Sequence, residues 1–291
     1  MQGETGLGMG ARQHAPQDAA QGERRREGRR PVVGVIVPPA AGEVPPELTQ
    51  LYGSEIDFVA YGLALGQLTP QGYDAVIDKV ATASRELVDR GAEAVALMGT
   101  SLSFYRGTAF NRQLVRTMSK ATGGLPVTTM SNAVVEALRA VGGTRVALAT
   151  AYTAEVNERL AIFLRESGFD VAGTAALELV EIPDIHAVGG AQLLELGRRA
   201  IAVSPGANAL LISCGGLRTL PVELPLERSL GMSVVSSAVA GAWAAARLTG
   251  HPGTVAGRTR LLGLAAERGA SQEVRLGDEG DAALRDRRAI Q

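Results

Sequence analysis

The chain is poor in the side chains on which most protein chemistry depends. Its 291 residues include one cysteine and three histidines. A single cysteine excludes an intramolecular disulfide and a thiolate metal cluster, and it indicates a reducing compartment. His14 and His251 lie in or near the terminal segments, so a Ser-His-Asp triad or a histidine-rich metal site would depend on His186 alone. We therefore expect neither a hydrolase triad nor a metal site.

The chain also lacks long apolar runs and an excess of either charge. No apolar stretch approaches the ~18 to 20 residues that a membrane span needs, and no apolar core of a signal peptide follows the first residues. Lys and Arg number 29 against 30 Asp and Glu, so no strong field favours nucleic acid or an anionic membrane. With 46% hydrophobic residues the chain can bury a full core. We expect a cytoplasmic protein whose partner is a small molecule.

Neither end of the chain has the pattern of a folded segment. Residues 1–30 contain no aromatic and no β-branched aliphatic residue and end in ERRREGRR (23–30), which is typical of a disordered extension. Their GLGMG run (6–10) follows no strand, so we expect no dinucleotide site there. Residues 258–291 are charged and weakly periodic, which predicts a loosely ordered tail.

Between these ends, short apolar runs alternate with longer amphipathic ones. VVGVIVPP (32–39) and ALLISCGG (209–216) predict buried strands, while residues 70–91, with Pro at the start and Gly at the end, predict a helix. Continuous apolar strands that alternate with helices indicate an α/β fold with parallel sheets covered on both faces. The other strands are expected at 94–101, 125–130, 145–152 and 232–237, and a further helix at 154–168.

The six predicted strands fall into two triplets of the same order. In each triplet the second strand ends in a turn of small or hydroxyl residues, and the third leads into a helix that begins with Ser. This repeat predicts two pseudo-symmetric halves, 31–131, completed by the helix near 237–249, and 132–236. Each half should present its site at the carboxyl ends of its strands, so LMGTS (97–101) and LISCGG (211–216) would form facing walls of one cleft.

The two turns supply hydrogen-bond donors. Thr100 and Ser101 offer hydroxyls on one side, and Tyr152 and the backbone N–H groups of Cys214 and Gly215 offer donors on the other. Converging neutral donors suit a carboxylate, or an oxyanion that forms during a reaction. The same side chains also have structural interpretations: a small buried cysteine, hydroxyls that cap a helix, a tyrosine at the core edge. Their shared position at strand ends favours a site.

Five runs carry a family resemblance. They are VIVPPAAG (35–42), GYDAVI (72–77), LMGTSLSFYRG (97–107), ATAYTAEVNERL (149–160) and SCGGL (213–217). These runs resemble the arylmalonate decarboxylase family, within the aspartate/glutamate racemase superfamily. The resemblance spans most of residues 32–248 and does not reach the tails. It implies a pseudo-symmetric pair of α/β halves with the active site between them, the arrangement that the repeat also predicts.

The distribution of cysteine separates the reactions of that superfamily. Its racemases resemble one another in carrying a cysteine in each strand-end turn, one for each face of a planar carbanion. This chain has Gly99 in the first turn and Cys214 in the second. The departure argues against racemisation, hydantoin racemase activity and maleate cis-trans isomerisation, which in similar proteins also uses a cysteine in each half. A decarboxylase needs a single proton donor.

The resemblance implies a carboxy-lyase that decarboxylates 2-aryl- or 2-alkenylmalonates without a cofactor. One carboxylate of the dicarboxylate would bind the donors described above, and Cys214 would protonate one face of the enediolate. The thiol must then be protonated, with a pKa near or above about 8.5. The second carboxylate would enter an apolar pocket. The matching pocket residues are Pro38, Leu65, Leu68, Tyr73, Ile182 and Ile185, with Gly99 and Gly216 elsewhere in the cleft.

Two other classes of function stay open on the sequence alone. One is an isomerase or racemase of the same superfamily with an unusual second acid, acting on maleate, an amino acid or a hydantoin. The other is a non-catalytic protein that holds a carboxylate with the same donors. The pattern specifies neither an oligomeric state nor the handedness of a product.

Overall fold

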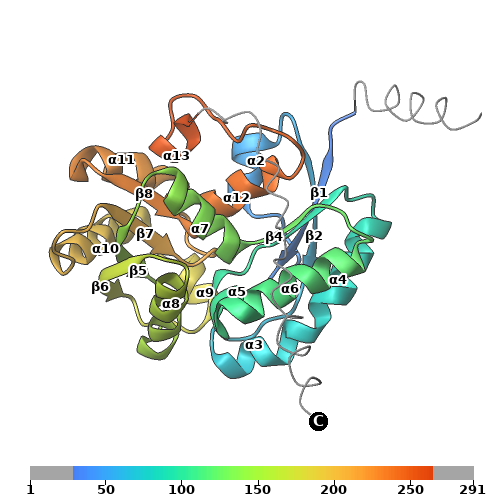
Figure 1. Ribbon diagram of the computed structural model, residues 1–291, viewed down its shortest axis with the longest axis horizontal. Coiled ribbons are helices and arrows are strands. Elements are labelled where there is room, and N and C mark those ends of the chain that lie inside the picture. The colour runs from blue at the N-terminus through green and yellow to red at the C-terminus, as the bar shows by residue number, and fades with distance from the viewer. Residues whose placement is uncertain (1–28, 265–291) are drawn as a thin grey trace, which may run out of the picture.

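Two sheets, each of four parallel strands, form the centre of the molecule (Figure 1). The computed structural model describes residues 29–264, so most of the predicted extension and most of the predicted tail lie outside the described residues. The sheet orders, β2-β1-β3-β4 and β6-β5-β7-β8, are equivalent, which confirms the predicted pair of pseudo-symmetric α/β halves. The strands are β1 (Val32–Val37), β2 (Asp57–Gly62), β3 (Ala94–Leu97), β4 (Val127–Thr129), β5 (Arg145–Thr150), β6 (Asp170–Ala176), β7 (Ala209–Ser213) and β8 (Ser233–Ser236).

The outer strands β2 and β6 are not among the six predicted strands. Every residue of β2 is half-buried, and β6 has one buried residue among its seven. By contrast, β3 and β7 are buried along their whole length. The other two edge strands, β4 and β8, are covered by α7 (Met130–Ala140) and α12 (Ser237–Arg247), whereas β2 and β6 are covered less completely, so their sequences lack a continuous apolar run. The pattern therefore predicted the inner strands and missed one edge of each sheet.

Helices cover both faces of the sheets (Figure 1). The predicted helix over 70–91 is interrupted, because Val76 leaves the helical region at φ −120° and starts a short 3₁₀ turn, Ile77–Lys79. Among residues 29–264, no helix has both the length and the apolar character to cross a bilayer. The helices are α2 (Pro46–Tyr52), α3 (Pro70–Val76), α4 (Val80–Asp89), α5 (Thr100–Phe104), α6 (Gly107–Ala121), α7 (Met130–Ala140), α8 (Ala154–Glu166), α9 (Ile182–His186), α10 (Gly190–Ala202), α11 (Leu220–Leu230), α12 (Ser237–Arg247) and α13 (Arg260–Gly263).

The helices α7 and α12 begin alike and pack together. Thr129 caps α7 by accepting from the N–H of Asn132, and Ser236 caps α12 by accepting from the N–H of Val239. Each helix follows the last strand of its sheet, so the caps repeat the duplication at residue level. The helix α12, predicted to complete the first half, contacts β3 and β4 of the first sheet as well as β7 and β8 of the second.

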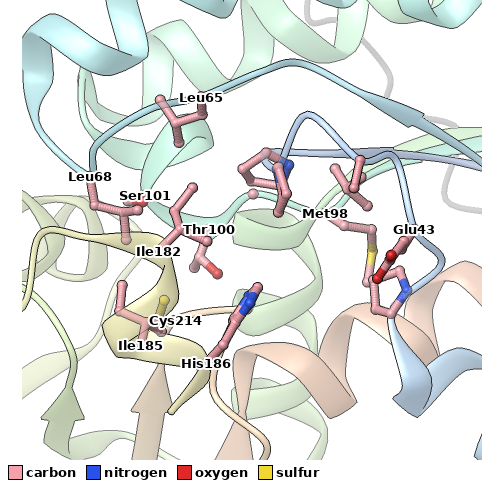
Figure 2. Close-up of a pocket in the computed structure, with 18 of the residues that line it drawn as sticks. Glu43, Leu65, Leu68, Met98, Thr100, Ser101, Ile182, Ile185, His186 and Cys214 are labelled. Atoms are coloured by element: carbon pink, nitrogen blue, oxygen red, sulfur yellow. The ribbon is translucent and has the colours of Figure 1, made fainter. Parts of the chain in front are cut away.

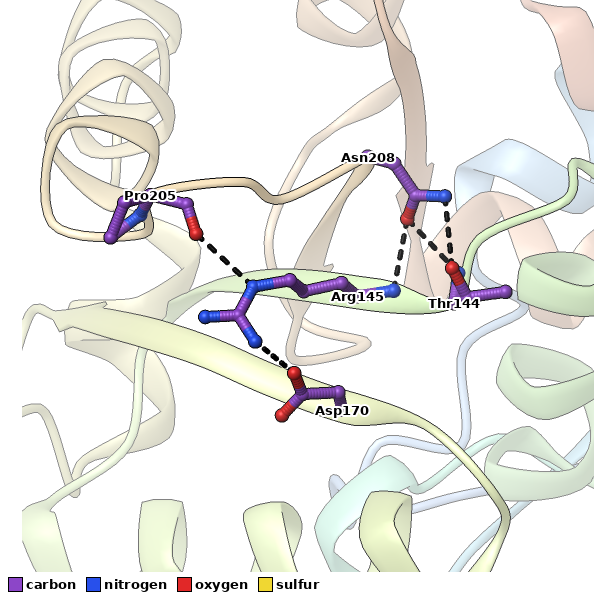
Figure 3. Close-up of polar contacts among 5 residues, drawn as sticks. All are labelled: Thr144, Arg145, Asp170, Pro205 and Asn208. Carbon is purple, nitrogen blue, oxygen red and sulfur yellow. Dashed lines mark hydrogen bonds and ion pairs between the residues drawn. The ribbon is translucent and has the colours of Figure 1, made fainter.

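One asparagine and one arginine join the amino ends of β5, β6 and β7 (Figure 3). The Asn208 side-chain oxygen accepts from the N–H groups of Thr144 and Arg145 at 3.0 and 2.9 Å. The Arg145 guanidinium donates to the Pro205 carbonyl at 3.1 Å and pairs with Asp170 on β6. These bonds hold the strands in register at the end of the second sheet that lies away from the predicted site.

Candidate active site

The carboxyl ends of strands from both sheets open into one cavity of about 740 Å³ (Figure 2). Its wall is built from the segments that follow β1, β2, β3, β5 and β7, together with α9. This is where parallel α/β sheets place their ligands, because the loops at this edge carry the free backbone groups. Of the thirteen residues predicted for the site, twelve line the cavity: Pro38, Leu65, Leu68, Gly99, Thr100, Ser101, Tyr152, Ile182, Ile185, Cys214, Gly215 and Gly216.

The first turn presents its hydroxyls to the cavity. Thr100 and Ser101 are the first two residues of α5, whose N-cap is Gly99 without a side-chain cap. The alternative interpretation, in which these hydroxyls cap a helix, is therefore wrong. The Thr100 hydroxyl donates to Sδ of Met130 at 2.8 Å. A thioether is a weak acceptor, so this donor remains available to a stronger acceptor in the cavity.

A buried serine holds the first turn in place. The Ser103 hydroxyl lies 2.9 Å from the Gly99 carbonyl oxygen and 2.6 Å from the Ser131 hydroxyl, which in turn donates to the Thr100 carbonyl at 3.0 Å. Both serines are almost completely buried. Because these bonds connect the backbone of the turn to α7, the turn keeps its position without strong hydrogen bonds from the side chains of Thr100 and Ser101.

Cys214 follows the last residue of β7 and faces the first turn across the cavity. Its side chain lines the cavity although it is only 5% exposed. Burial raises the pKa of the thiol from 9.0 to about 11, and hydrogen bonds from the Gly216 and Leu217 N–H groups and the Tyr152 hydroxyl lower it by less. The thiol is therefore protonated at neutral pH. This protonation state meets the condition that a proton donor requires.

Tyr152 brings a buried phenol to the same side as the thiol. Its hydroxyl accepts from the Ser213 hydroxyl at 3.4 Å, and its ring packs edge-on against Phe104 with centroids 5.7 Å apart. The Asn157 side-chain amide donates to the Tyr152 carbonyl at 3.0 Å and fixes the backbone. Burial raises the pKa of the phenol well above its ordinary value, so the hydroxyl keeps its proton and can donate it in a hydrogen bond.

Aliphatic side chains line the cavity wall next to these donors: Figure 2 shows Leu68 beside Ser101 and Ile185 beside Cys214. Leu65 and Leu68 come from the segment before α3, and Ile182 and Ile185 come from α9 (Figure 2). The two segments meet directly, since the Leu68 N–H donates to the Val180 carbonyl at 3.0 Å. The Gln67 side-chain amide also donates to Glu181 at 2.6 Å. These aliphatic side chains offer no hydrogen-bond donor to a carboxylate.

The structure does not place Tyr73 on the cavity wall, where the family resemblance put it. Its ring is fully buried and packs against Tyr105 with centroids 4.9 Å apart. Its hydroxyl is buried without a hydrogen-bond partner among residues 29–264. The hydroxyl nevertheless lies near the donors of the site: burial raises the pKa of this phenol, the nearby Ser101 hydroxyl lowers it and Cys214 raises it.

Sequence reasoning missed the polar side chains of the wall. Glu43 follows β1, His186 ends α9 and Arg218 follows the glycines after Cys214; all three line the cavity and are exposed. Arg218 directly follows the SCGGL run, and His186 directly follows Ile185. Their position next to predicted site residues was the sequence signal that could have placed them in the cavity wall. Among residues 29–264, no group of three or more His, Cys, Asp and Glu side chains is arranged to hold a metal ion.

Comparison with known proteins assigns the chain to a family. The family model described as arylmalonate decarboxylase matches residues 33–262. An arylmalonate decarboxylase from Bordetella bronchiseptica is 51% identical over 220 residues, covering 76% of this chain and 91% of that protein. A maleate isomerase from Nocardia farcinica is 28% identical over 239 residues, covering 79% and 94%.

A solved structure agrees with the sequence comparison. It is a liganded arylmalonate decarboxylase in which a glycine is changed to cysteine and a cysteine to serine. It superposes with a TM-score of 0.77 at 49% identity, covering 79% of this chain and 98% of that one. This chain belongs to the arylmalonate decarboxylase family and is a carboxy-lyase.

Proposed function

We propose that this enzyme decarboxylates 2-aryl- or 2-alkenylmalonates to chiral monocarboxylic acids without a cofactor, and that Cys214 is its single proton donor. The observation that carries the proposal is the pairing of a protonated thiol with Gly99 in one cavity, whose wall combines hydroxyl donors with an aliphatic cluster. The reaction requires no electron-accepting cofactor, because the carboxylate that stays on the substrate accepts the electron pair that CO₂ leaves behind.

The retained carboxylate binds the hydrogen-bond donors of the two strand-end turns and of Tyr152. The hydroxyls of Thr100, Ser101 and Tyr152 and the backbone N–H groups of Cys214 and Gly215 supply neutral donors there. As the carbon–carbon bond breaks, negative charge spreads from the α-carbon onto the two oxygens of this carboxylate and forms an enediolate. Donors already fixed around these oxygens stabilise the added charge without reorganising, which lowers the barrier. An aryl or alkenyl substituent delocalises the same charge.

The departing carboxylate lies against the aliphatic side chains of the cavity wall. Leu65, Leu68 and Ile185 are each less than 10% exposed, and Ile182 completes the wall. A carboxylate that loses its water here without gaining donors is destabilised, and its conversion into neutral CO₂ removes that cost. Binding energy from the retained carboxylate at its donors, and from the substituent, holds the substrate in this position.

Protonation occurs on one face of the enediolate. The S–H proton of Cys214 moves to the α-carbon, the carbon–hydrogen bond forms, and the thiolate left behind regains a proton from solvent. The opposite face meets Gly99, which has no side chain to deliver a proton. The product therefore has a single handedness, and the enzyme does not take up a proton from the other side, as a racemase must.

The test is the release of CO₂ from phenylmalonate by purified enzyme after treatment with a chelator and gel filtration. We expect release by the wild type, loss of about 10² to 10⁴ in rate with Cys214→Ala, and partial activity with Cys214→Ser. A variant at exposed Glu158, outside the cavity, controls for handling. No release by the wild type, or full activity of Cys214→Ala, would contradict the proposal.

Maleate isomerisation is the second candidate, because maleate isomerases are among the relatives of this chain. One thiol argues against it, since Gly99 occupies the turn where similar isomerases carry their other cysteine. Incubation with maleate, with fumarate measured by chromatography, separates the two reactions. Exchange and racemisation of a single 2-arylpropionate enantiomer in D₂O would favour a racemase, and ligand-induced stabilisation without any turnover would favour a non-catalytic binder.

A further inference from the structure

The polar side chains of the cavity wall form a group of their own, separate from the donors of the proposed reaction. Glu43 lies on the first half of the molecule, and His186 and Arg218 lie on the second. All three are exposed at the wall. Figure 2 shows the His186 ring pointing into the cavity, in a position between Cys214 and Glu43 in that view. We call Glu43, His186 and Arg218 the polar rim.

The His186 ring lies close to the backbone of Gly216. A Cβ added at Gly216 would lie 3.3 Å from Cδ2 and 3.4 Å from Nε2 of His186, and 3.1 Å from Cγ2 of Ile185. The ring therefore lies directly on the backbone of the turn that carries Cys214. A ligand that reaches from the thiol toward the open end of the cavity passes this imidazole.

The polar rim has unused hydrogen-bonding capacity. Within the part of the chain that the structure describes, none of the three side chains makes a hydrogen bond or an ion pair. Burial and the nearby Arg218 lower the pKa of His186, so its imidazole is neutral at neutral pH and both donates and accepts. The guanidinium of Arg218 supplies donors only, and the carboxylate of Glu43 accepts only.

The charges of the polar rim select the kind of group that fits. The positive charge of Arg218 already acts on the buried carboxyl group of Glu47, and Glu43 adds a negative charge at the rim. A negatively charged substituent would therefore face Glu43, and a positively charged one would face Arg218. A neutral group that both donates and accepts can use all three side chains. A cavity of about 740 Å³ is large enough for drug-sized ligands. An aromatic substituent can therefore extend from the carboxylate-binding donors to the polar rim.

We propose that Glu43, His186 and Arg218 form a specificity site for an uncharged hydroxyl on the aromatic substituent, so that hydroxyarylmalonates are the preferred substrate class. The inference rests on the proposed function. The ring hydroxyl donates to Glu43 and accepts from Arg218 or His186, and it takes no part in bond breaking or in proton transfer to the α-carbon.

The test compares kcat/KM for phenylmalonate, 4-methylphenylmalonate, and 3- and 4-hydroxyphenylmalonate. A ring hydroxyl also changes the electronic stability of the enediolate, so the deciding quantity is how each variant changes the ratio of hydroxylated to unsubstituted substrate. With Arg218→Met or Glu43→Gln we expect this ratio to fall about tenfold, the loss of one hydrogen bond to a charged group, while phenylmalonate changes less than about twofold. Arg228→Met, at an exposed position outside the cavity, is the matched control.

Three outcomes would overturn the inference. Variants that slow all four substrates equally would show a structural role only, and variants that leave the ratio unchanged would show no role. A larger selective loss with 4-carboxyphenylmalonate would show that the rim binds an anion. If no malonate is decarboxylated, the proposed function fails. Calorimetry then compares the affinities of hydroxyphenylacetate and phenylacetate for the same variants, and so tests separately whether the polar rim binds the hydroxyl.

Discussion

The buried thiol of Cys214 leads to a prediction that distinguishes a proton donor from a base or nucleophile. With a pKa of about 11, about one thiol in a thousand is ionised at pH 8, against about one in ten for an ordinary pKa of 9.0. Iodoacetamide reacts with the thiolate, so alkylation of the folded enzyme at pH 8 should be about a hundredfold slower than the ordinary value implies. Restricted entry to the cavity slows it further.

The pH dependence of alkylation separates ionisation from access. The chain has one cysteine, so the mass of the intact adduct reports Cys214 alone. From pH 7 to 10 the rate should rise about tenfold per pH unit without levelling off, and the urea-unfolded chain should level off earlier, near its ordinary pKa. Circular dichroism shows where the fold persists, and Cys214→Ser should not be labelled. A rate that levels off near pH 8 in the folded enzyme would refute the reasoning, because an abundant thiolate suits a base.

Three further predictions concern other groups. Gly99→Cys/Cys214→Ala should give the product of opposite handedness on chiral chromatography, at a stability cost of about 1 to 3 kcal/mol because the new Cβ would lie 3.1 Å from Cβ of Leu102; unchanged handedness would contradict the facing walls. Tyr152→Phe should lower kcat/KM about 10²-fold with an unchanged circular dichroism spectrum, and an unaffected rate would remove the phenol from the donor set. Burial raises the pKa of Glu223 from 4.5 to about 8, so the native state holds a proton that the unfolded state releases, and stability should fall by about 1.4 kcal/mol per pH unit as pH rises from 4.5 to 8. Urea unfolding should show that Glu223→Gln lacks this slope, and parallel slopes would contradict it.

Sequence patterns predicted the fold where burial is continuous. The runs that became β1, β3, β5 and β7 are mostly apolar because helices cover both faces of each sheet, and this character is visible without coordinates. The cavity followed from the same reasoning, since the carboxyl ends of parallel strands share an edge. The edge strands β2 and β6 were missed because partial exposure permits mixed residues.

The polar rim and the place of Tyr73 depend on packing between distant segments. Glu43 and Arg218 are 175 positions apart in the numbering, and nothing in either local sequence indicates that they line one cavity. Tyr73 was placed on the wall by family resemblance; in the structure its ring packs against Tyr105, off the cavity wall, while its hydroxyl stays near Ser101 and Cys214. Both depend on how helices orient against the sheets, which short-range patterns do not specify.

The contact between the Thr100 hydroxyl and the sulfur of Met130 has a consequence for oxidative damage. A peroxide that enters the cavity meets a cysteine that is almost entirely protonated, and such a thiol oxidises slowly. A thioether needs no deprotonation to react; Met98 lines the cavity, whereas Met130 is 2% exposed and is not part of its lining. Sulfoxide formation at Met130 would replace a weak acceptor with a strong one, and the Thr100 hydroxyl would then be held by the protein rather than offered to the substrate. The oxidation-sensitive residue around this cavity is thus expected to be a methionine rather than the cysteine, and methionine sulfoxide reductases can repair it.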